Sequence, residues 1–375
     1  MMKFWSYSQE YKKIKKTIFK SIDKTLNSGK LFYGPELEKF EHKFNKFNKS
    51  KYGLAVGSGT DALFIALKTL NIGLNDEVIT VSNTAIPTVS AIVTAGAKVR
   101  FVDIGTNYLI NVNKIEQCIT KKTKAIIPVH LYGQACDMNQ ICKLAKKYNL
   151  KVIEDCAQAQ GAKYKNTHVG SIGDVGCFSF YPTKILGAYG DGGFLTTKSQ
   201  KLYEKMKRMR FYGIDNFNKK NKYNNKYYSN EHGINSRISE IQLSILNIKL
   251  PKVNYWINKR RKIAKIYSDA LKKTSLKLPS ELKGNKDVYH LYTVYHPKRK
   301  LIMKEMKKKK INLKIYYPFP IHKMKGYKEK TSNSNYLPVT EKMSHGIFSL
   351  PLYPEIKLSD VKKIIKSLKS VLTTI

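Results

Sequence analysis

The stretch Gly176-Cys177-Phe178-Ser179-Phe180-Tyr181-Pro182-Thr183-Lys184 joins an apolar run to a lysine through an irregular Tyr-Pro step. The run predicts a buried strand. An earlier segment, Val152-Ile153-Glu154-Asp155, has the same apolar character and ends in two acids. Between about residues 50 and 200, short β-branched runs alternate with helical patterns, which is typical of a parallel α/β sheet. Ligands bind beyond the carboxyl ends of the strands in such sheets, so Asp155 and Lys184 are expected there.

The rest of the chain divides into expected elements and two domains. Further strands are predicted over residues 53–56, 78–81, 99–102 and 125–129, with helices over 60–70 and 236–250. Pro251 is expected to end the second helix. Residues 216–230, rich in Asn, Lys and Tyr, are expected to form a mobile excursion. We predict a large domain over residues 1–250 and a smaller C-terminal domain over 251–375.

The charge of the chain is strongly positive. Its 375 residues include 69 Lys and Arg but only 27 Asp and Glu, which gives a formal net charge of +42. Such an excess suggests a nucleic-acid partner. However, the basic residues are spread along the whole chain among many Asn, Ile and Tyr, and no helix-turn-helix, zinc-finger or RNA-binding motif accompanies them. We therefore attribute the charge to compositional drift, expect no nucleic-acid partner, and note that the field would attract a diphosphate-bearing substrate.

The cysteines and the apolar runs of the sequence bear on the cellular compartment of the protein. The five cysteines form no CxxC pair and have no histidine at metal-ligand spacing, so we expect neither disulfides nor a metal site. Scattered unpaired cysteines fit a reducing compartment. The N-terminus shows no signal-peptide pattern, and no apolar run reaches the ~20 residues of a membrane helix. We predict a cytoplasmic protein with no membrane partner.

Lys184 and Asp155 together suit pyridoxal phosphate (PLP) chemistry. A lysine supplies the Schiff base, and a carboxylate keeps the pyridine nitrogen of the cofactor protonated. Taken singly, a lysine is most often a solvated surface residue, and an acid after a strand is often a helix cap. Gln158 follows Asp155 by three residues, where it either donates to the phenolic oxygen of the cofactor or caps the next turn.

The stretch Gly57-Ser58-Gly59-Thr60-Asp61-Ala62 follows one predicted strand and opens a helix. Glycines admit close backbone approach, and free amides at a helix N-terminus hold phosphate, so a phosphate cup competes here with a plain capped turn. The stretch also fits the GxGxxA dinucleotide pattern, but Asp76-Glu77 precede the next strand instead of following it. Ser179 adds a hydroxyl to the same phosphate or is an ordinary strand serine. Asp191-Gly192 is also compatible with a hairpin turn.

Several aromatic and imidazole side chains complete the set of candidates. His130, Tyr316, Tyr317 and His322 lie in predicted loops, where each alone is more often structural than functional. The candidate substrate-binding set is Tyr181, Tyr189, Tyr316, Tyr317 and His322.

These motifs resemble the DegT-type, PLP-dependent nucleotide-sugar aminotransferases. The resemblance covers most of the chain and also includes the segments 34–41, 130–134 (His-Leu-Tyr-Gly-Gln), 235–237 with Glu240 and Gln242, and 316–318. It implies the PLP fold type I, aspartate-aminotransferase-like architecture: a three-layer α/β large domain with a mostly parallel central sheet, and a smaller α/β C-terminal domain.

The resemblance also implies roles for individual residues. Lys184 is similar to the Schiff-base lysine and proton shuttle, Asp155 to the partner of the ring nitrogen, and Gln158 to the residue beside the phenolic oxygen. Asn235 is similar to an asparagine that reaches the phosphate in the neighbouring subunit, which implies a homodimer with shared active sites. The phosphate cup would be formed by Ser58, Gly59, Thr60 and Ser179.

Residues 83–88, Asn-Thr-Ala-Ile-Pro-Thr, and residues 317–322 look most like the branch that aminates C3 of dTDP-linked 3-keto-6-deoxyhexoses, with glutamate as donor. Many relatives stack an aromatic residue on the cofactor where this chain has Ala85. Relatives with histidine in place of the lysine are dehydratases, and Lys184 argues against that activity. Amination at C4 of a UDP- or GDP-linked sugar is an alternative, as is a non-catalytic regulatory or nucleic-acid-binding protein of the same fold.

Overall fold

The computed structural model describes residues 2–214, 228–332 and 336–375, and most of the expected excursion at 216–230 lies outside them. A seven-stranded sheet has the order β1-β9-β8-β5-β4-β2-β3. From β8 to β3 all pairs are parallel, whereas β9 runs antiparallel to both β1 and β8. The prediction of a mostly parallel sheet is therefore confirmed. The strands are β1 (Tyr52–Val56), β2 (Glu77–Val81), β3 (Lys98–Val102), β4 (Thr123–Ile126), β5 (Lys151–Asp155), β8 (Val175–Ser179) and β9 (Gly193–Thr197).

Strand β9 is the central strand that sequence analysis did not predict as a strand. It pairs with β8 in antiparallel register, Ser179 opposite Gly193, and the Phe180 N–H donates to the carbonyl of Gly192 at 2.7 Å. Asp191-Gly192 is thus the end of a long connection and not a two-residue turn. Lys184 lies within this connection, between the two strands.

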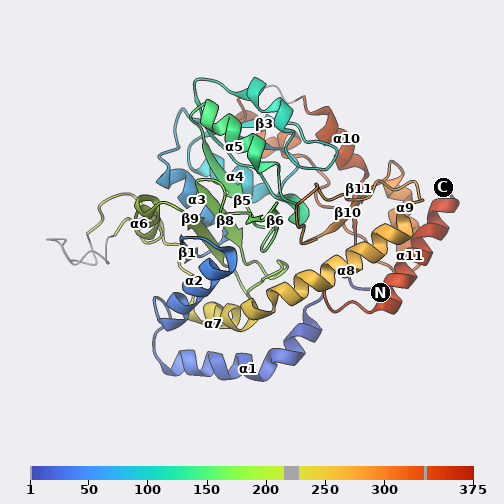
Figure 1. Cartoon of the computed structure of the whole chain (residues 1–375), viewed down its shortest axis with the longest axis horizontal. Coiled ribbons are helices and arrows are strands. Elements are labelled where there is room, and N and C mark those ends of the chain that lie inside the picture. Colours follow the sequence, from blue (N-terminus) through green and yellow to red (C-terminus); the bar gives the residue numbers. More distant parts are fainter. Residues whose placement is uncertain (1, 215–227, 333–335) are drawn as a thin grey trace.

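Consecutive strand residues point to opposite faces of the sheet, and each face has its own hydrophobic core. Ala55, Ile126 and Phe178 pack in one core, and their neighbours Leu54 and Cys177 pack in the other. The first core is completed by α2 (Pro35–Asn48), α5 (Met138–Lys147) and α7 (Glu240–Lys249), and the second by α3 (Gly59–Thr69), α4 (Ile86–Thr94) and α6 (Gln200–Met209). Helices on both faces make the three layers visible in Figure 1.

The C-terminal part has a core of its own. The two-stranded sheet of β10 (Tyr292–Tyr295) and β11 (Ile347–Leu350) packs with α9 (Arg299–Lys308) and α11 (Leu358–Thr373). Pro251 lies in a short 3-10 turn that ends α7, and α8 (Val253–Leu271) begins directly after it. Because α8 places Trp256 in the first core and Tyr267 in the C-terminal core, the domain boundary at residue 251 stays a prediction.

The N-terminal helix α1 (Ser8–Asn27) lies along α7 (Figure 1). Ile14 and Ile18 of α1 pack against Ile245 of α7. The remaining elements are α10 (Pro338–Gly346) and the small hairpin of β6 (Lys163–Tyr164) and β7 (Thr167–His168). Among the described residues, no helix combines the length and apolar character needed to cross a bilayer.

Candidate active site

A cavity of about 470 Å³ lies at the carboxyl ends of β1, β2, β5 and β8. The segments that follow these strands contribute four groups of lining residues: Ser58, Gly59 and Thr60; Ala85, Pro87 and Thr88; Asp155, Ala157 and Gln158; Ser179, Tyr181, Thr183 and Lys184. The C-terminal part adds His290, Leu291, Tyr316, Tyr317 and Leu352, and the N-terminal segment adds Phe4 and Trp5. The cavity therefore lies where the sheet topology places ligands.

Asp155 is buried at the end of β5 with its carboxylate held from two sides. Oδ2 accepts a hydrogen bond from the Thr88 hydroxyl at 2.8 Å, and Oδ1 accepts one from the Ala157 N–H at 3.1 Å. A charge-assisted bond of this kind fixes the orientation of a carboxylate. The carboxylate is oriented at the cavity wall, which is the position needed to face a cationic ring nitrogen.

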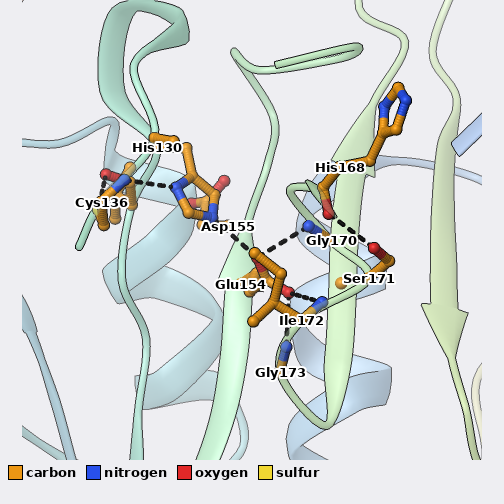
Figure 2. Close-up of polar contacts among 12 residues, drawn as sticks. His130, Cys136, Glu154, Asp155, His168, Gly170, Ser171, Ile172 and Gly173 are labelled. Carbon is orange, nitrogen blue, oxygen red and sulfur yellow. Dashed lines mark hydrogen bonds and ion pairs between the residues drawn. The ribbon is translucent and has the colours of Figure 1, made fainter. Parts of the chain in front are cut away.

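Glu154, the residue before Asp155, links the segment after β4 to the segment before β8. Its carboxylate accepts from the N–H groups of Gly170, Ile172 and Gly173 at 2.7–2.8 Å and lies 3.1 Å from His130 Nε2 (Figure 2). Burial alone would raise the pKa of Glu154, but the hydrogen bonds from His130 and the backbone outweigh it and hold that pKa below its ordinary value. This network anchors the end of the strand that carries Asp155.

The Glu154 network also accounts for the role of His130. The Nδ1 of His130 accepts from the Cys136 N–H at 3.0 Å, and its other nitrogen faces Glu154 (Figure 2). Glu154, His130 and Cys156 lie close enough together to resemble a metal-binding group. Because the carboxylate oxygens and both ring nitrogens are already engaged, this cluster is a structural hydrogen-bond network.

Lys184 lines the same cavity as Asp155. Burial lowers its pKa to about 8, even though the Asp155 carboxylate acts in the opposite direction. No carboxylate forms an ion pair with the Lys184 amine in the described ranges. The amine is consequently neutral in a large fraction of molecules near pH 8, which is the form that acts as a nucleophile.

The loop between β1 and α3 forms a cup that meets the end of β8. The Ser58 hydroxyl accepts from the Asp61 N–H at 3.0 Å and so caps α3. The N–H groups of Gly59 and Thr60, at the start of the helix, have no intrahelical acceptor. An added Cβ at Gly59 would lie 2.7 Å from the Cβ of Ser179. The absence of a side chain at Gly59 therefore lets the helix N-terminus and Ser179 face the same point.

Gln158 is oriented by hydrogen bonds on both sides of its amide. Its oxygen accepts from the Tyr132 N–H at 2.8 Å, and its nitrogen donates to the Tyr317 hydroxyl at 3.0 Å. Burial raises the pKa of Tyr317 well above its ordinary range, so this phenol stays protonated. The Tyr132 hydroxyl in turn donates to the carbonyl of Tyr316. Gln158 thus presents an N–H donor on the cavity side, next to two tyrosines.

Three candidates from the sequence do not line this cavity. His322 is buried between Ser82, at 2.7 Å, and Glu341, at 3.0 Å, where it links β2 to α10. Tyr189 packs against Tyr7, Tyr11 and the Lys249 ammonium. Asn235 is exposed, and its side-chain oxygen accepts from Arg237. Within a single chain, none of the three touches the space that the other candidates enclose.

Other lining residues were not among the candidates. Thr88 occurred only within the quoted segment 83–88, and nothing in the sequence singled out Phe4 and Trp5. His290 is buried, and its Nδ1 has no hydrogen-bond partner in the part of the chain that the structure describes. Burial, reinforced by the Lys184 and Arg260 charges, holds its pKa well below the ordinary value, so the imidazole is neutral. Ala85 does line the cavity, beside Pro87 and Thr88, so this part of the wall is formed by small side chains.

The residues present fit pyridoxal phosphate. The cup of Ser58, Gly59, Thr60 and Ser179 suits a phosphate, the Asp155 carboxylate suits a protonated ring nitrogen, and the unpaired Lys184 amine suits an aldehyde. The fold and this arrangement together define the class: a PLP-dependent enzyme of fold type I.

The comparisons with known proteins specify the family. Residues 12–369 match the DegT/DnrJ/EryC1/StrS aminotransferase family, and the chain belongs to it. It is 39% identical to dTDP-3-amino-3,4,6-trideoxy-alpha-D-glucose transaminase of Micromonospora megalomicea subsp. nigra, over 98% of both chains. It is 40% identical to dTDP-3-amino-3,6-dideoxy-alpha-D-galactopyranose transaminase of Aneurinibacillus thermoaerophilus, again over 98% of both. The crystal structure of a DegT DnrJ EryC1 StrS aminotransferase from Brucella abortus superposes with a TM-score of 0.94 at 32% identity, covering 99% of this chain and 100% of that one. The protein is an aminotransferase, and the cofactor of its family is pyridoxal phosphate.

Proposed function

We propose that this protein transfers the amino group of glutamate to C3 of a dTDP-linked 3-keto-6-deoxyhexose. The observation that carries the chemistry is the meeting of Asp155, at the end of β5, and Lys184, in the connection after β8, at one cavity with a phosphate cup. The position on the sugar is supported by the two relatives named above, both of which are transaminases of dTDP-linked 3-amino sugars.

Each cavity residue has a proposed task. Bound PLP acts as an electron sink for the carbon that gains or loses the amino group. Lys184 would hold the cofactor covalently and would move a proton at the reacting carbon, and its lowered pKa favours both tasks. Asp155, oriented by Thr88, would face the ring nitrogen. Gln158 donates toward the phenolic oxygen, and Ser58, Gly59, Thr60 and Ser179 hold the phosphate.

Substrate recognition is assigned to the tyrosines at the cavity wall. Tyr181 is 52% exposed, and Tyr316 and Tyr317 form the side of the cavity that belongs to the C-terminal part. Their hydroxyl groups suit a polyhydroxylated ligand. The net charge of +42 adds a field that draws an anionic diphosphate to the protein.

The proposal includes a homodimer with shared active sites. Asn235 is exposed, and its loop lies beside the phosphate cup. The neighbouring Ser236 hydroxyl holds the loop there, since it accepts from the Gly57 N–H and donates to Asp61. Beside it, the Arg237 guanidinium lies 4.6 Å from the ring centroid of Phe32, an aromatic side chain that is 43% exposed. An exposed amide next to exposed apolar surface suits a subunit contact through which Asn235 reaches the phosphate of the partner subunit.

The proposed compartment is the cytoplasm. All five cysteines are free thiols, and three of them, Cys136, Cys156 and Cys177, are buried. Free thiols are typical of a reducing environment.

Absorbance of the purified protein tests the chemistry. The wild type should show the near-visible band of bound cofactor, and glutamate should shift that band. Lys184→Ala should show no such band and no turnover, whereas Lys201→Ala, a substitution at an exposed position of α6, should behave as wild type. Activity retained in Lys184→Ala would refute the assignment.

Defined keto sugars test the regiochemistry. The enzyme is supplied with glutamate and either a dTDP-linked 3-keto-6-deoxyhexose or a UDP-linked 4-keto sugar, and the new amine is located by NMR. Amination of only the 4-keto sugar would replace the proposed C3 activity with the C4 alternative.

Mixing two inactive variants tests the shared site. Lys184→Ala and Asn235→Ala subunits, once exchanged, should form heterodimers in which one of the two sites is intact. Random exchange then restores about a quarter of the wild-type activity. If both residues served the same chain's site, mixing would restore nothing.

A further inference from the structure

The first residues of the chain form a strap across one side of the cavity. The Met2 N–H donates to the Lys310 carbonyl at 2.8 Å, and Met2 pairs with Ile311 in a parallel bridge. At the other end of the strap, the Tyr7 ring lies 5.4 Å from that of Tyr189, five residues after Lys184. The strap, residues 2–7, is therefore fastened both to the C-terminal part and to the segment that carries the catalytic lysine.

Between these two anchors, Phe4 and Trp5 line the cavity. Phe4 is buried, and its ring lies 6.0 Å from that of Tyr316. Trp5 continues the row, with its ring 5.4 Å from that of Tyr7. One ring contact thus joins the strap to Tyr316 through Phe4, and two others join Trp5 through Tyr7 to Tyr189.

Trp5 is less buried than Phe4, and its indole N–H is not used in a hydrogen bond within the described residues. Phe4 is 9% exposed and packed on Tyr316, so its surface is used to hold the strap in place. Trp5 is only partly buried, and its indole N–H has no hydrogen-bond partner among the residues that the structure describes. Trp5 therefore brings to the cavity lining an indole ring whose N–H is not used within the described chain.

The charged groups that line the cavity, Asp155, Lys184 and Asp191, come from segments next to the strands of the central sheet and not from the strap. The phosphate cup, Asp155, Gln158 and Lys184 all come from strand ends of the central sheet. The strap contributes aromatic surface and no charge to the lining. A deoxyhexose presents C–H faces with hydroxyl groups at the rim, which matches an indole plane with one N–H at its edge.

We infer that the strap is the apolar wall of the sugar subsite and that Trp5 is the residue on which the hexose ring packs. The inference rests on the proposed function, because it assigns this wall to the keto sugar and not to the amino-acid donor. Trp5 is then a specificity residue for the acceptor half of the reaction.

Fluorescence tests the placement of Trp5 without any turnover. The chain has two tryptophans, and Trp256 is buried in α8. In Trp256→Phe, Trp5 is the only tryptophan, and saturation with dTDP-glucose as an unreactive probe should change its emission at least about twofold. In Trp5→Phe, the emission of Trp256 should stay within about a tenth of its starting value. A probe that binds but leaves Trp5 emission unchanged would overturn the inference.

Kinetics of the two half-reactions test its role. Trp5→Ala should raise KM for the keto sugar at least about tenfold, and Trp5→Phe, which keeps an aromatic face, only about twofold to threefold. In Trp5→Ala, the rate constant of the half-reaction with glutamate, divided by that of the half-reaction with the keto sugar, should rise at least about tenfold over the wild-type ratio. Equal losses in both half-reactions would show that the strap is only structural and would overturn the inference. If the wild type reacts with glutamate but converts no keto sugar, the proposed function itself fails.

Discussion

The Thr88 hydroxyl donates a 2.8 Å hydrogen bond to the carboxylate of Asp155, although the two residues belong to different elements and lie 67 positions apart. Thr88 is in the first turn of α4, and its oxygen also lies 2.9 Å from the Thr84 hydroxyl. The orientation of the Asp155 carboxylate at the cavity wall is thus set by the segment after β2.

Thr88→Val should weaken cofactor binding. Valine keeps the shape of threonine but removes the donor to a buried carboxylate, and hydrogen bonds to charged groups contribute about 1.5–3 kcal/mol. The Kd of the apoprotein for PLP should rise about tenfold to a hundredfold, as measured by absorbance titration. Thr88→Ser retains the donor and should bind within about threefold of wild type. Equal weakening in both variants would indicate that the methyl group, and not the hydrogen bond, is what matters.

The capture of PLP by the apoprotein should depend on pH through Lys184. A lysine with a pKa lowered to about 8 gains neutral amine as the pH rises through that value. The capture rate should therefore increase about fivefold between pH 7 and 8, and less than about twofold between pH 8 and 9. A rate that continues to climb tenfold per unit to pH 10 would mean that burial does not lower this pKa.

Gly59→Ala should damage the phosphate cup. The added Cβ would lie 2.7 Å from the Cβ of Ser179, so either the helix N-terminus or the strand end must shift. We expect PLP affinity to fall at least about tenfold, which corresponds to about 1.4 kcal/mol. Gly326→Ala is the matched control, because an added Cβ there meets nothing within 4 Å. Unchanged affinity in Gly59→Ala would place the phosphate elsewhere.

Glu154→Ala should destabilise the fold strongly. The substitution removes a fully buried carboxylate that accepts hydrogen bonds from three backbone N–H groups and contacts His130. Breaking a buried pair typically costs about 3–5 kcal/mol, which should appear as a lower midpoint of urea unfolding. Glu116→Ala, which removes an exposed ion pair with Lys147, should leave the midpoint unchanged. A small effect at Glu154 would mean that water replaces its carboxylate.

Much of the large domain was predictable from the sequence because the relevant signals are local. The apolar residues at 152–153 and 176–180 identify β5 and β8, since a strand covered on both faces is rich in apolar residues. The glycine-rich start of α3 and the lysine after β8 were likewise read from short segments. Asp155, Gln158, Ser58, Gly59, Thr60, Ser179 and Lys184, all named from the sequence, do line one cavity.

The tertiary structure alone decided which segments meet at that cavity. Local patterns show which face a side chain occupies, but not which distant segment covers it. For that reason Thr88, His290 and the strap with Trp5 went unnoticed, while Tyr189 and His322 were named although they pack elsewhere. The strand order, with β9 between β1 and β8, is what brings the lysine segment next to the phosphate cup. Neighbours of this kind depend on contacts between residues far apart in the chain, and single-residue properties do not encode them.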